Sequence, residues 1–176
     1  MNHPRVGRRT ALALTLAACA GFVQSAWPKT PGEVEVGQTL REATMRGLNT
    51  PARKLSQYRG KPLLINVWAS WCGPCKLEMG SLERLAWRNE AKQFNLIGIS
   101  TDDSEQAAKS YLQRSNASIT HYIDTALEME HMLGAERLPL TVLVDAKGKV
   151  LGKFYGAREW DDAEALRWIE SKLRKP

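Results

Sequence analysis

Two cysteines three residues apart are the part of this sequence best suited to chemistry. Cys72 and Cys75 stand in the segment WCGPCK, directly after an apolar run. Pairs with this spacing form a structural disulfide, contribute half of a metal site, or exchange electrons with other thiols. A disulfide across so short a loop removes little chain entropy, and zinc normally needs four ligands. The spacing therefore favours thiol–disulfide exchange, with a metal-binding or structural pair as the alternatives.

The position of each thiol predicts a different task for it. Cys72 is expected at the start of a helix, where free N–H groups and the helix dipole lower a thiol pKa below about 8.5. Cys75 lies one turn further in, within reach of a mixed disulfide at Cys72. Between them stand Gly73 and Pro74, and proline has no N–H to offer the thiolate. A less stabilised dithiol is a better electron donor, so we predict an exposed attacking Cys72, a sheltered resolving Cys75 and a reducing pair.

Glu78 is the candidate proton acceptor for this pair. It follows Cys75 by three residues, which places the two side chains on one face of a helix. A partly buried carboxyl there would take the proton of Cys75 during resolution, whereas the plainer alternative is a solvated glutamate. Asn66, on the apolar run before the cysteines, cannot titrate. Glu78 is therefore the best nearby proton carrier.

Further metal ligands are scarce in the sequence. No second CxxC and no HxxxH motif is present. His121 and His131 are isolated, and each is expected on the surface or on a helix face. We predict no metal site and no cofactor beyond the redox-active disulfide of Cys72 and Cys75. A copper- or zinc-binding module that uses this pair remains an alternative.

The N-terminal segment is typical of an export signal. MNHPRVGRR supplies positive charge, TALALTLAACAGFV is apolar, and small residues follow in VQSA. We predict a signal peptide or membrane anchor over residues 1–26. The stretch LAAC resembles a bacterial lipobox, which would place a lipid on Cys19, and Arg8-Arg9 raises a twin-arginine route. Each version places the domain outside the cytoplasm, in the periplasm, where disulfides persist.

Composition excludes several broad classes of protein. The chain has 176 residues, of which 43% are hydrophobic and 25% charged, as in one ordinary globular domain. No stretch reaches the roughly 20 apolar residues that span a bilayer. The net charge is +6, but three arginines lie in the export signal and the other basic residues form no cluster. This weak charge does not favour a nucleic-acid partner.

The remaining residues predict one α/β domain over residues 39–176. Residues 27–38 are rich in proline and glycine and are expected to form a linker. Periodicity of apolar residues then predicts an N-terminal β-hairpin extension and a mixed central sheet with helices on both faces. The predicted strands are 40–45, 52–55, 63–67, 94–100, 119–123, 140–144 and 150–155. One predicted helix begins at the CxxC pair, and three more span about 105–114, 126–133 and 160–173.

The segment around the cysteines resembles a known family. LLINVWASWCGPCKLEM is similar to the active-site segment of thioredoxin-fold proteins, specifically the exported TlpA/ResA-like thiol:disulfide oxidoreductases. The export signal, Asn66 in place of a buried acid, and Glu78 favour this exported branch over cytoplasmic thioredoxin. The resemblance covers about residues 39–173 and implies a thioredoxin-like fold. Gly80 departs from the family, which usually has a proline there that kinks the helix.

The resemblance also implies a substrate-binding surface. Leu138-Pro139 matches the family's cis-proline loop, which faces the CxxC pair. The backbone of Leu138 would then pair with an extended substrate segment. Trp71, Gly73 and Pro74 would line the same docking surface. Without the resemblance, Pro139 would be a proline at a strand start and Trp71 a core aromatic residue.

The activity and partners implied by the resemblance are those of a periplasmic reductant of protein disulfides. Cys72 attacks the substrate, Cys75 releases the product, and Glu78 assists proton transfer. Related proteins receive electrons from an integral-membrane donor, and their substrates include haem-site cysteines of apocytochrome c and copper-site cysteines of oxidases under assembly. A thiol peroxidase is the alternative enzyme, but its Thr-x-x-Cys context is replaced here by Ala69-Ser-Trp-Cys.

Overall fold

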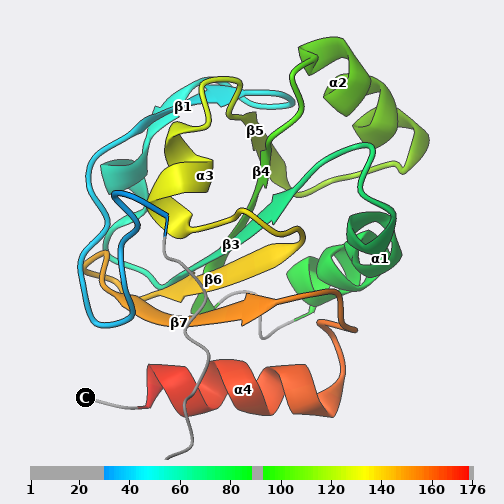
Figure 1. Ribbon diagram of the computed structural model, residues 1–176. Helices are drawn as coiled ribbons and strands as arrows, with labels where there is room; N and C mark the ends of the chain where they lie inside the picture. Colours follow the sequence, from blue (N-terminus) through cyan, green and yellow to red (C-terminus); the bar gives the residue numbers. More distant parts are fainter. Residues whose placement is uncertain (1–29, 89–92, 175–176) are drawn as a thin grey trace, which may run out of the picture.

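A mixed β-sheet forms the centre of the computed structural model, which describes residues 30–88 and 93–174 (Figure 1). The strand order is β2-β1-β5-β4-β3-β6-β7. The central strands β3, β4 and β5 are parallel, whereas β1, β6 and β7 pair antiparallel to their neighbours. The strands are β1 (Thr44–Gly47), β2 (Arg53–Lys54), β3 (Leu63–Trp68), β4 (Asn95–Ser100), β5 (Thr120–Ile123), β6 (Leu140–Val144) and β7 (Val150–Tyr155).

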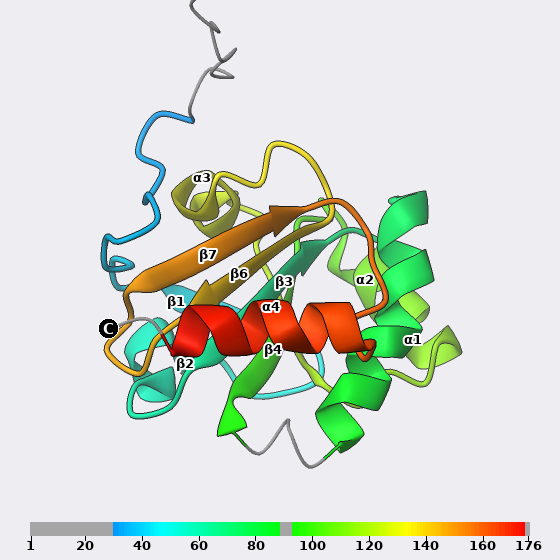
Figure 2. The same ribbon diagram turned by 90° about the horizontal axis from the view of Figure 1, so that it is seen from below.

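Helices cover both faces of the sheet, as predicted. One apolar cluster collects side chains from α1, α2 and α4 on one face, and a second collects side chains from η1 and α3 on the other. Figure 2 shows α4 lying across the sheet with α1 beside it. The helices are η1 (a 3-10 helix, Leu55–Tyr58), α1 (Gly73–Trp87), α2 (Glu105–Arg114), α3 (Glu128–Leu133) and α4 (Ala163–Leu173).

Strand β3 places the cysteine pair. All six of its residues are buried, as expected from the apolar run LLINVW. Because side chains alternate across a strand, Leu64 and Trp68 enter the cluster under α1, while Ile65 and Val67 enter the opposite cluster. Asn66 lies two residues from both Leu64 and Trp68, so its side chain points to the same face of the sheet, toward α1.

Helices α2 and α4 begin directly after capping residues. The side chain of Ser104 accepts the N–H of Ala107 at the start of α2, as its position predicts. Asp162 caps α4 by accepting the N–H of Ala165 at 2.7 Å. Helix α4 therefore begins at residue 163, three residues later than predicted. Trp160, the first residue of the predicted helix, lies in the loop before it.

The stretch before β1 packs on the domain from residue 30 onward, although its composition predicts a linker over residues 27–38. Val34 is buried, and its N–H donates to the carbonyl of Met132 at 2.9 Å. The N–H of Gly37 donates to the carbonyl of Val150 at 2.8 Å. These contacts hold the stretch against α3 and β7, because an apolar side chain and backbone N–H groups find partners there.

The predicted export signal over residues 1–26, including Cys19, lies outside the described residues and stays a prediction. Residues 27–29 of the expected linker lie outside them as well. Within 30–88 and 93–174, no helix combines the length and the hydrophobicity needed to cross a bilayer.

Candidate active site

Cys72 and Cys75 form a disulfide at the N-terminal end of α1. Their Cα atoms lie 5.3 Å apart, with Cys72 at the N-cap position and Cys75 in the first turn. The sulfur of Cys72 accepts the backbone N–H of Cys75 at 3.2 Å. Pro74 stands in the first turn, where a missing N–H interrupts no intrahelical bond. The helix continues through Gly80 to Trp87 as one element.

Cys72 is less exposed than the sequence predicted. In the disulfide form it is 5% exposed and Cys75 is 1% exposed. Both side chains pack into the apolar cluster under α1, and the bond to buried Cys75 holds the Cys72 sulfur against that cluster. Trp71, in contrast, is 68% exposed, which excludes a core position for this residue.

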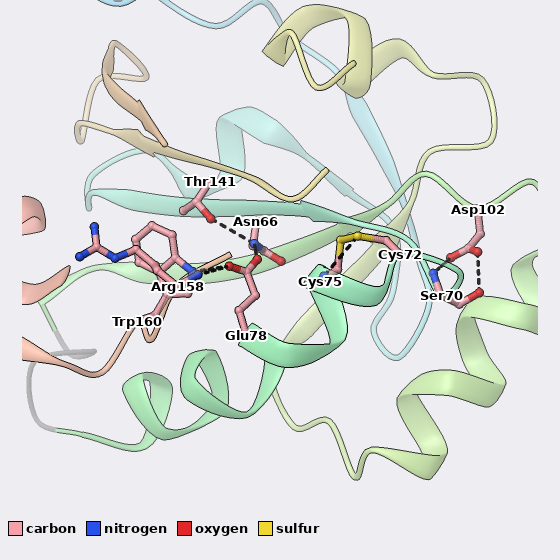
Figure 3. Close-up of a disulfide and its surroundings, with 9 residues drawn as sticks. All are labelled: Asn66, Ser70, Cys72, Cys75, Glu78, Asp102, Thr141, Arg158 and Trp160. Carbon is pink, nitrogen blue, oxygen red and sulfur yellow. Dashed lines mark hydrogen bonds between the residues drawn. A yellow bond between two sulfur atoms is a disulfide. The ribbon is translucent and has the colours of Figure 1, made fainter. Parts of the chain in front are cut away.

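Glu78 is buried and fully engaged by hydrogen-bond donors (Figure 3). Its Oε1 accepts from Nδ2 of Asn66 at 2.7 Å. Its Oε2 accepts from Nε1 of Trp160 at 2.9 Å and from the backbone N–H of Arg158 at 3.3 Å. Burial raises the pKa of Glu78 to about 7, and the three hydrogen bonds oppose that rise because they favour the ionised form. A carboxyl that titrates near neutral pH is suited to accept and release a proton, and the solvated alternative is excluded.

Asn66 joins this carboxylate to strand β6. Its Nδ2 also donates to Oγ1 of Thr141 at 3.0 Å, and the two residues are paired in the sheet register. Its Oδ1 is buried and has no hydrogen-bond partner among the described residues. In Figure 3 this oxygen lies on the side of the amide that faces the cysteine pair.

The loop between β7 and α4 completes the surroundings of Glu78, a role that local patterns in the sequence do not predict. Trp160 is fully buried and donates its indole N–H to Glu78. Its backbone N–H donates to Oγ of Ser81 at 2.9 Å, and this hydroxyl donates to the carbonyl of Glu78 at 2.7 Å. The guanidinium of Arg158 pairs with Glu164 at 3.3 Å, so its backbone rather than its charge contacts Glu78.

A second buried carboxylate, Asp102, holds the segment that precedes Cys72. Ser70 donates its backbone N–H to Oδ2 at 2.8 Å and its hydroxyl to Oδ1 at 2.6 Å. The hydroxyl of Ser100 donates to Oδ2 at 2.7 Å. Both oxygens are thus occupied by donors, and Asp102 serves to fix the loop that carries Cys72.

The Leu138–Pro139 peptide bond is cis, as the resemblance implied. Leu138 is partly buried against the cluster that contains both cysteines. The carbonyl of Pro139 accepts the N–H of Gly156 at 2.9 Å, which ties this loop to the end of β7. The roles of this loop and of Trp71 in substrate binding stay predictions.

His121 lies in the core on a strand, so its predicted position on the surface or on a helix face is wrong. It stands on β5 with 0% exposure, and its Nδ1 accepts the indole N–H of Trp68 at 3.2 Å. Gly98 on β4 leaves room for the ring, because a Cβ there would collide with it. Burial lowers the pKa of His121 to about 3, so the ring is neutral at pH 7. His131 is exposed on α3, as expected.

Metal ligands do not gather elsewhere in the parts of the chain that the structure describes. Residues 30–88 and 93–174 contain no group of three or more His, Cys, Asp or Glu side chains able to hold a metal ion. The cysteine pair, Glu78 and their hydrogen-bond partners form the candidate active site.

Known proteins share the sequence pattern and the fold of this chain. A family model described as Redoxin matches residues 35–168. The chain is 26% identical over 171 residues to thiol-disulfide oxidoreductase ResA of Geobacillus kaustophilus (strain HTA426), covering 97% of each chain. It is 24% identical over 165 residues to ResA of Bacillus cereus (strain ATCC 10987 / NRS 248), covering 93% of this chain and 95% of that protein.

Solved structures agree with these sequence relatives. A protein of Chlorobium tepidum, assigned as thiol:disulfide interchange protein DsbE, matches with a TM-score of 0.72 at 26% identity. The match covers 80% of this chain and 99% of that chain. StoA of Bacillus subtilis matches with a TM-score of 0.64 at 16% identity, over 74% of this chain and 96% of that chain. At that identity StoA supports the fold alone.

Proposed function

The chain belongs to the redoxin family, and we propose that it works outside the cytoplasm as a reductant of protein disulfides. Its fold is thioredoxin-like, and it is a thiol:disulfide oxidoreductase, in keeping with its relatives and with the Cys72–Cys75 disulfide. The observation that carries the mechanism is a buried carboxyl, Glu78, one helical turn beyond Cys75, with a pKa of about 7.

Reduction of a substrate disulfide proceeds by two exchange steps. First, the Cys72 thiolate attacks one substrate sulfur, a mixed disulfide forms, and the other substrate sulfur leaves as a thiolate that takes up a proton. Then Cys75 gives its proton to Glu78 and attacks the Cys72 sulfur. The intramolecular disulfide forms, the second substrate sulfur leaves as a thiolate that takes up a proton, and Glu78 gives up the proton it received. Two electrons pass from the dithiol to the substrate.

Glu78 serves the second step because its pKa lies near the operating pH. A base with a pKa near 7 is ionised in a large fraction of molecules and still binds the proton firmly enough to help remove it. A solvated glutamate would be a much weaker base toward a thiol. Pro74 in the first turn supports the reducing direction, because it withholds one N–H from the Cys72 thiolate.

The proposed location is the periplasm, and the signal-like residues 1–26 support it. Anchoring through this segment or through a lipid on Cys19 belongs to the same proposal. In an oxidising compartment the dithiol must be restored after each turnover, so we propose a membrane electron donor of a thiol-reduction pathway as one partner. The proposed substrates are disulfides at the haem-site cysteines of apocytochrome c or at copper-site cysteines.

The proposed docking surface for these substrates surrounds Cys72. The 68% exposure of Trp71, next to Cys72, supports it, as does the packing of Leu138 against the cysteine cluster. An extended substrate segment would pair with the backbone of Leu138 before Pro139, with its sulfur at the cysteine pair. Gly73 and Pro74 would form the floor of this surface.

Trapping of the mixed disulfide tests the proposal. A Cys75→Ala variant lacks the resolving thiol, so a substrate attacked by Cys72 stays covalently attached and is identified by mass spectrometry. We expect exported proteins with paired cysteines, and none with the Cys72→Ala control. Insulin reduction and a metal titration of the purified protein complete the test. A dithiol form that is inactive toward insulin but takes up one metal ion would contradict the proposal.

A further inference from the structure

The carboxylate of Glu78 is surrounded by donors in the structure. Asn66, Trp160 and the backbone of Arg158 each give it an N–H. This arrangement suits an ionised carboxylate, which only accepts hydrogen bonds. A protonated carboxyl carries an O–H that needs an acceptor. An indole N–H and a backbone N–H cannot become acceptors, whereas an amide side chain has an oxygen to offer.

That amide oxygen has no partner in the disulfide form. Oδ1 of Asn66 is buried and makes no hydrogen bond to the described residues, while Nδ2 serves both Glu78 and Thr141. A buried acceptor left unpaired is costly, and in an active site it calls for an explanation. Asn66 lies on the sheet face covered by α1, the face that also receives the Cys75 side chain. Figure 3 shows the oxygen on the side of the cysteine pair.

We propose that the Asn66 amide turns over when the proton passes from Cys75 to Glu78, so that both charge states are hydrogen-bonded. Before transfer, Nδ2 donates to the Glu78 carboxylate and Oδ1 accepts the S–H of reduced Cys75. After transfer, Oδ1 accepts the O–H of Glu78 and Nδ2 donates to the Cys75 thiolate. One proton moves from sulfur to oxygen, and no electron moves in this step. The inference rests on the proposed function, in which Glu78 is the base.

The groups around Asn66 are compatible with both orientations of its side-chain amide. The hydroxyl of Thr141 accepts from Nδ2 now and can donate to Oδ1 after the turn, because a hydroxyl does either. The titratable groups beside the amide, Glu78 and Cys75, both lie on α1. Arg158, in the loop before α4, contacts Glu78 through its backbone N–H, while its guanidinium pairs with Glu164. Asn66 is therefore a positioning residue that acts through Glu78 and Cys75.

Stopped-flow reaction of the reduced protein with excess dithiobis-nitrobenzoate separates the two thiols. Attack by Cys72 releases the first coloured thiolate at a rate that depends on reagent concentration. Resolution by Cys75 releases the second at a rate that does not. In Asn66→Leu, which keeps the volume but neither donor nor acceptor, we expect the second phase to slow about tenfold at pH 7, the change that accompanies one pKa unit. Its pH profile shifts to higher pH, and the first phase keeps the wild-type rate.

The matched control is Leu64→Ala, which loosens the same face of β3 two residues away. We expect it to lower stability without moving the pH profile of the second phase. An unshifted profile in Asn66→Leu, or an equal shift in both variants, would overturn the inference. A wild-type protein without any second phase would instead refute the proposed function, so the two failures are distinguishable.

Nuclear magnetic resonance of the reduced wild-type protein tests the inference without altering Asn66. The side-chain NH2 signals of Asn66 should shift with pH at the midpoint of the Glu78 titration, and this shift should be absent in Glu78→Gln. Signals that stay unchanged through neutral pH in the wild-type protein would overturn the proposed turnover.

Discussion

Glu78 and His121 are two buried titratable side chains on the sheet face covered by α1 and α2. Their pKa values are shifted in opposite directions, upward for Glu78 and downward for His121. Their exposed fractions are 1% and 0%. Burial favours the neutral form of both. Three N–H donors compensate the charged form of Glu78, whose pKa is about 7. His121 accepts one N–H from Trp68, its Nε2 has no partner among the described residues, and its pKa is about 3.

The comparison shows that burial alone does not make an active-site group. A donor aimed at Nδ1 fits only the neutral ring of His121, because the charged ring carries N–H on both nitrogens. Donors aimed at Glu78 support its charged form and keep both forms populated near pH 7. The surroundings thus leave Glu78 able to exchange a proton and His121 fixed as a packing and hydrogen-bonding group.

The largest effect should come from removing the charge of Glu78. We expect Glu78→Gln to slow resolution by Cys75 by about 10²–10⁴-fold at neutral pH, the usual range for loss of a general base. Attack by Cys72 should stay near the wild-type rate, because its thiolate is stabilised by the helix N-terminus. The two-phase thiolate-release assay measures both steps. The matched control is His121→Gln, which should leave both rates unchanged. If resolution by Cys75 slowed equally in the two variants, the assignment of Glu78 as the base would be contradicted.

The next largest effect is the acid sensitivity caused by His121. An unfolded histidine binds a proton below pH 6.5, whereas folded His121 does so only near pH 3. The contribution of His121 to stability is therefore fully present above pH 6.5 and is lost as the pH falls toward 3, by at most about 5 kcal/mol. His121→Gln keeps an acceptor for Trp68 and should lack this loss. Denaturant unfolding at pH 7 and at pH 4 measures it, and parallel losses in both proteins would contradict the assignment.

Glu78 should have the opposite pH dependence. Its folded pKa of about 7 exceeds the ordinary value of 4.5, so the folded protein binds more protons between these values. The contribution to stability is present below pH 4.5 and is lost as the pH rises through 7, by about 3 kcal/mol. Glu78→Gln should remove this loss. Unfolding of the oxidised protein at pH 5 and pH 8 provides the check, and a wild-type curve that matches the variant at both values would argue against a raised pKa.

The smallest effect should follow loss of one donor to Glu78. Trp160→Phe keeps the buried ring but removes the indole N–H, so the pKa of Glu78 rises further and resolution slows by about tenfold or less at pH 7. The control is Trp168→Phe, because the Trp168 ring packs 6.0 Å from that of Trp160 in the same cluster. A shifted pH profile in both variants would assign the effect to packing instead of the hydrogen bond.

Local sequence patterns predicted most helices and strands of this molecule and the placement of Glu78 beside Cys75. The apolar run of β3 and the helical spacing of Cys75 and Glu78 are properties of short segments, so the sequence displays them directly. The partners of Glu78 are not local. Trp160 lies 82 residues further along the chain, and its place depends on how the loop before α4 packs on α1. Asp162 was a usable signal, because a capping residue there ends the loop and excludes Trp160 from the helix.

His121 was misplaced for a similar reason. Its burial depends on the pairing of β5 with β4, which sets Gly98 opposite the histidine and leaves space for the ring. That register depends on how the strands pack in the folded protein, and no motif in either strand predicts it. The acceptor role of Asn66 likewise emerges only when α1 is packed on β3.

One titration of the oxidised wild-type protein tests the central comparison most directly. With isotope labels on glutamate carboxyls and histidine rings, nuclear magnetic resonance follows Glu78 and His121 in the same sample, and spectra of Glu78→Gln and His121→Gln assign the signals. We predict a midpoint near pH 7 for the Glu78 carboxyl and a ring of His121 that stays neutral well below pH 6.5. A Glu78 midpoint at the ordinary value of 4.5 would contradict the account.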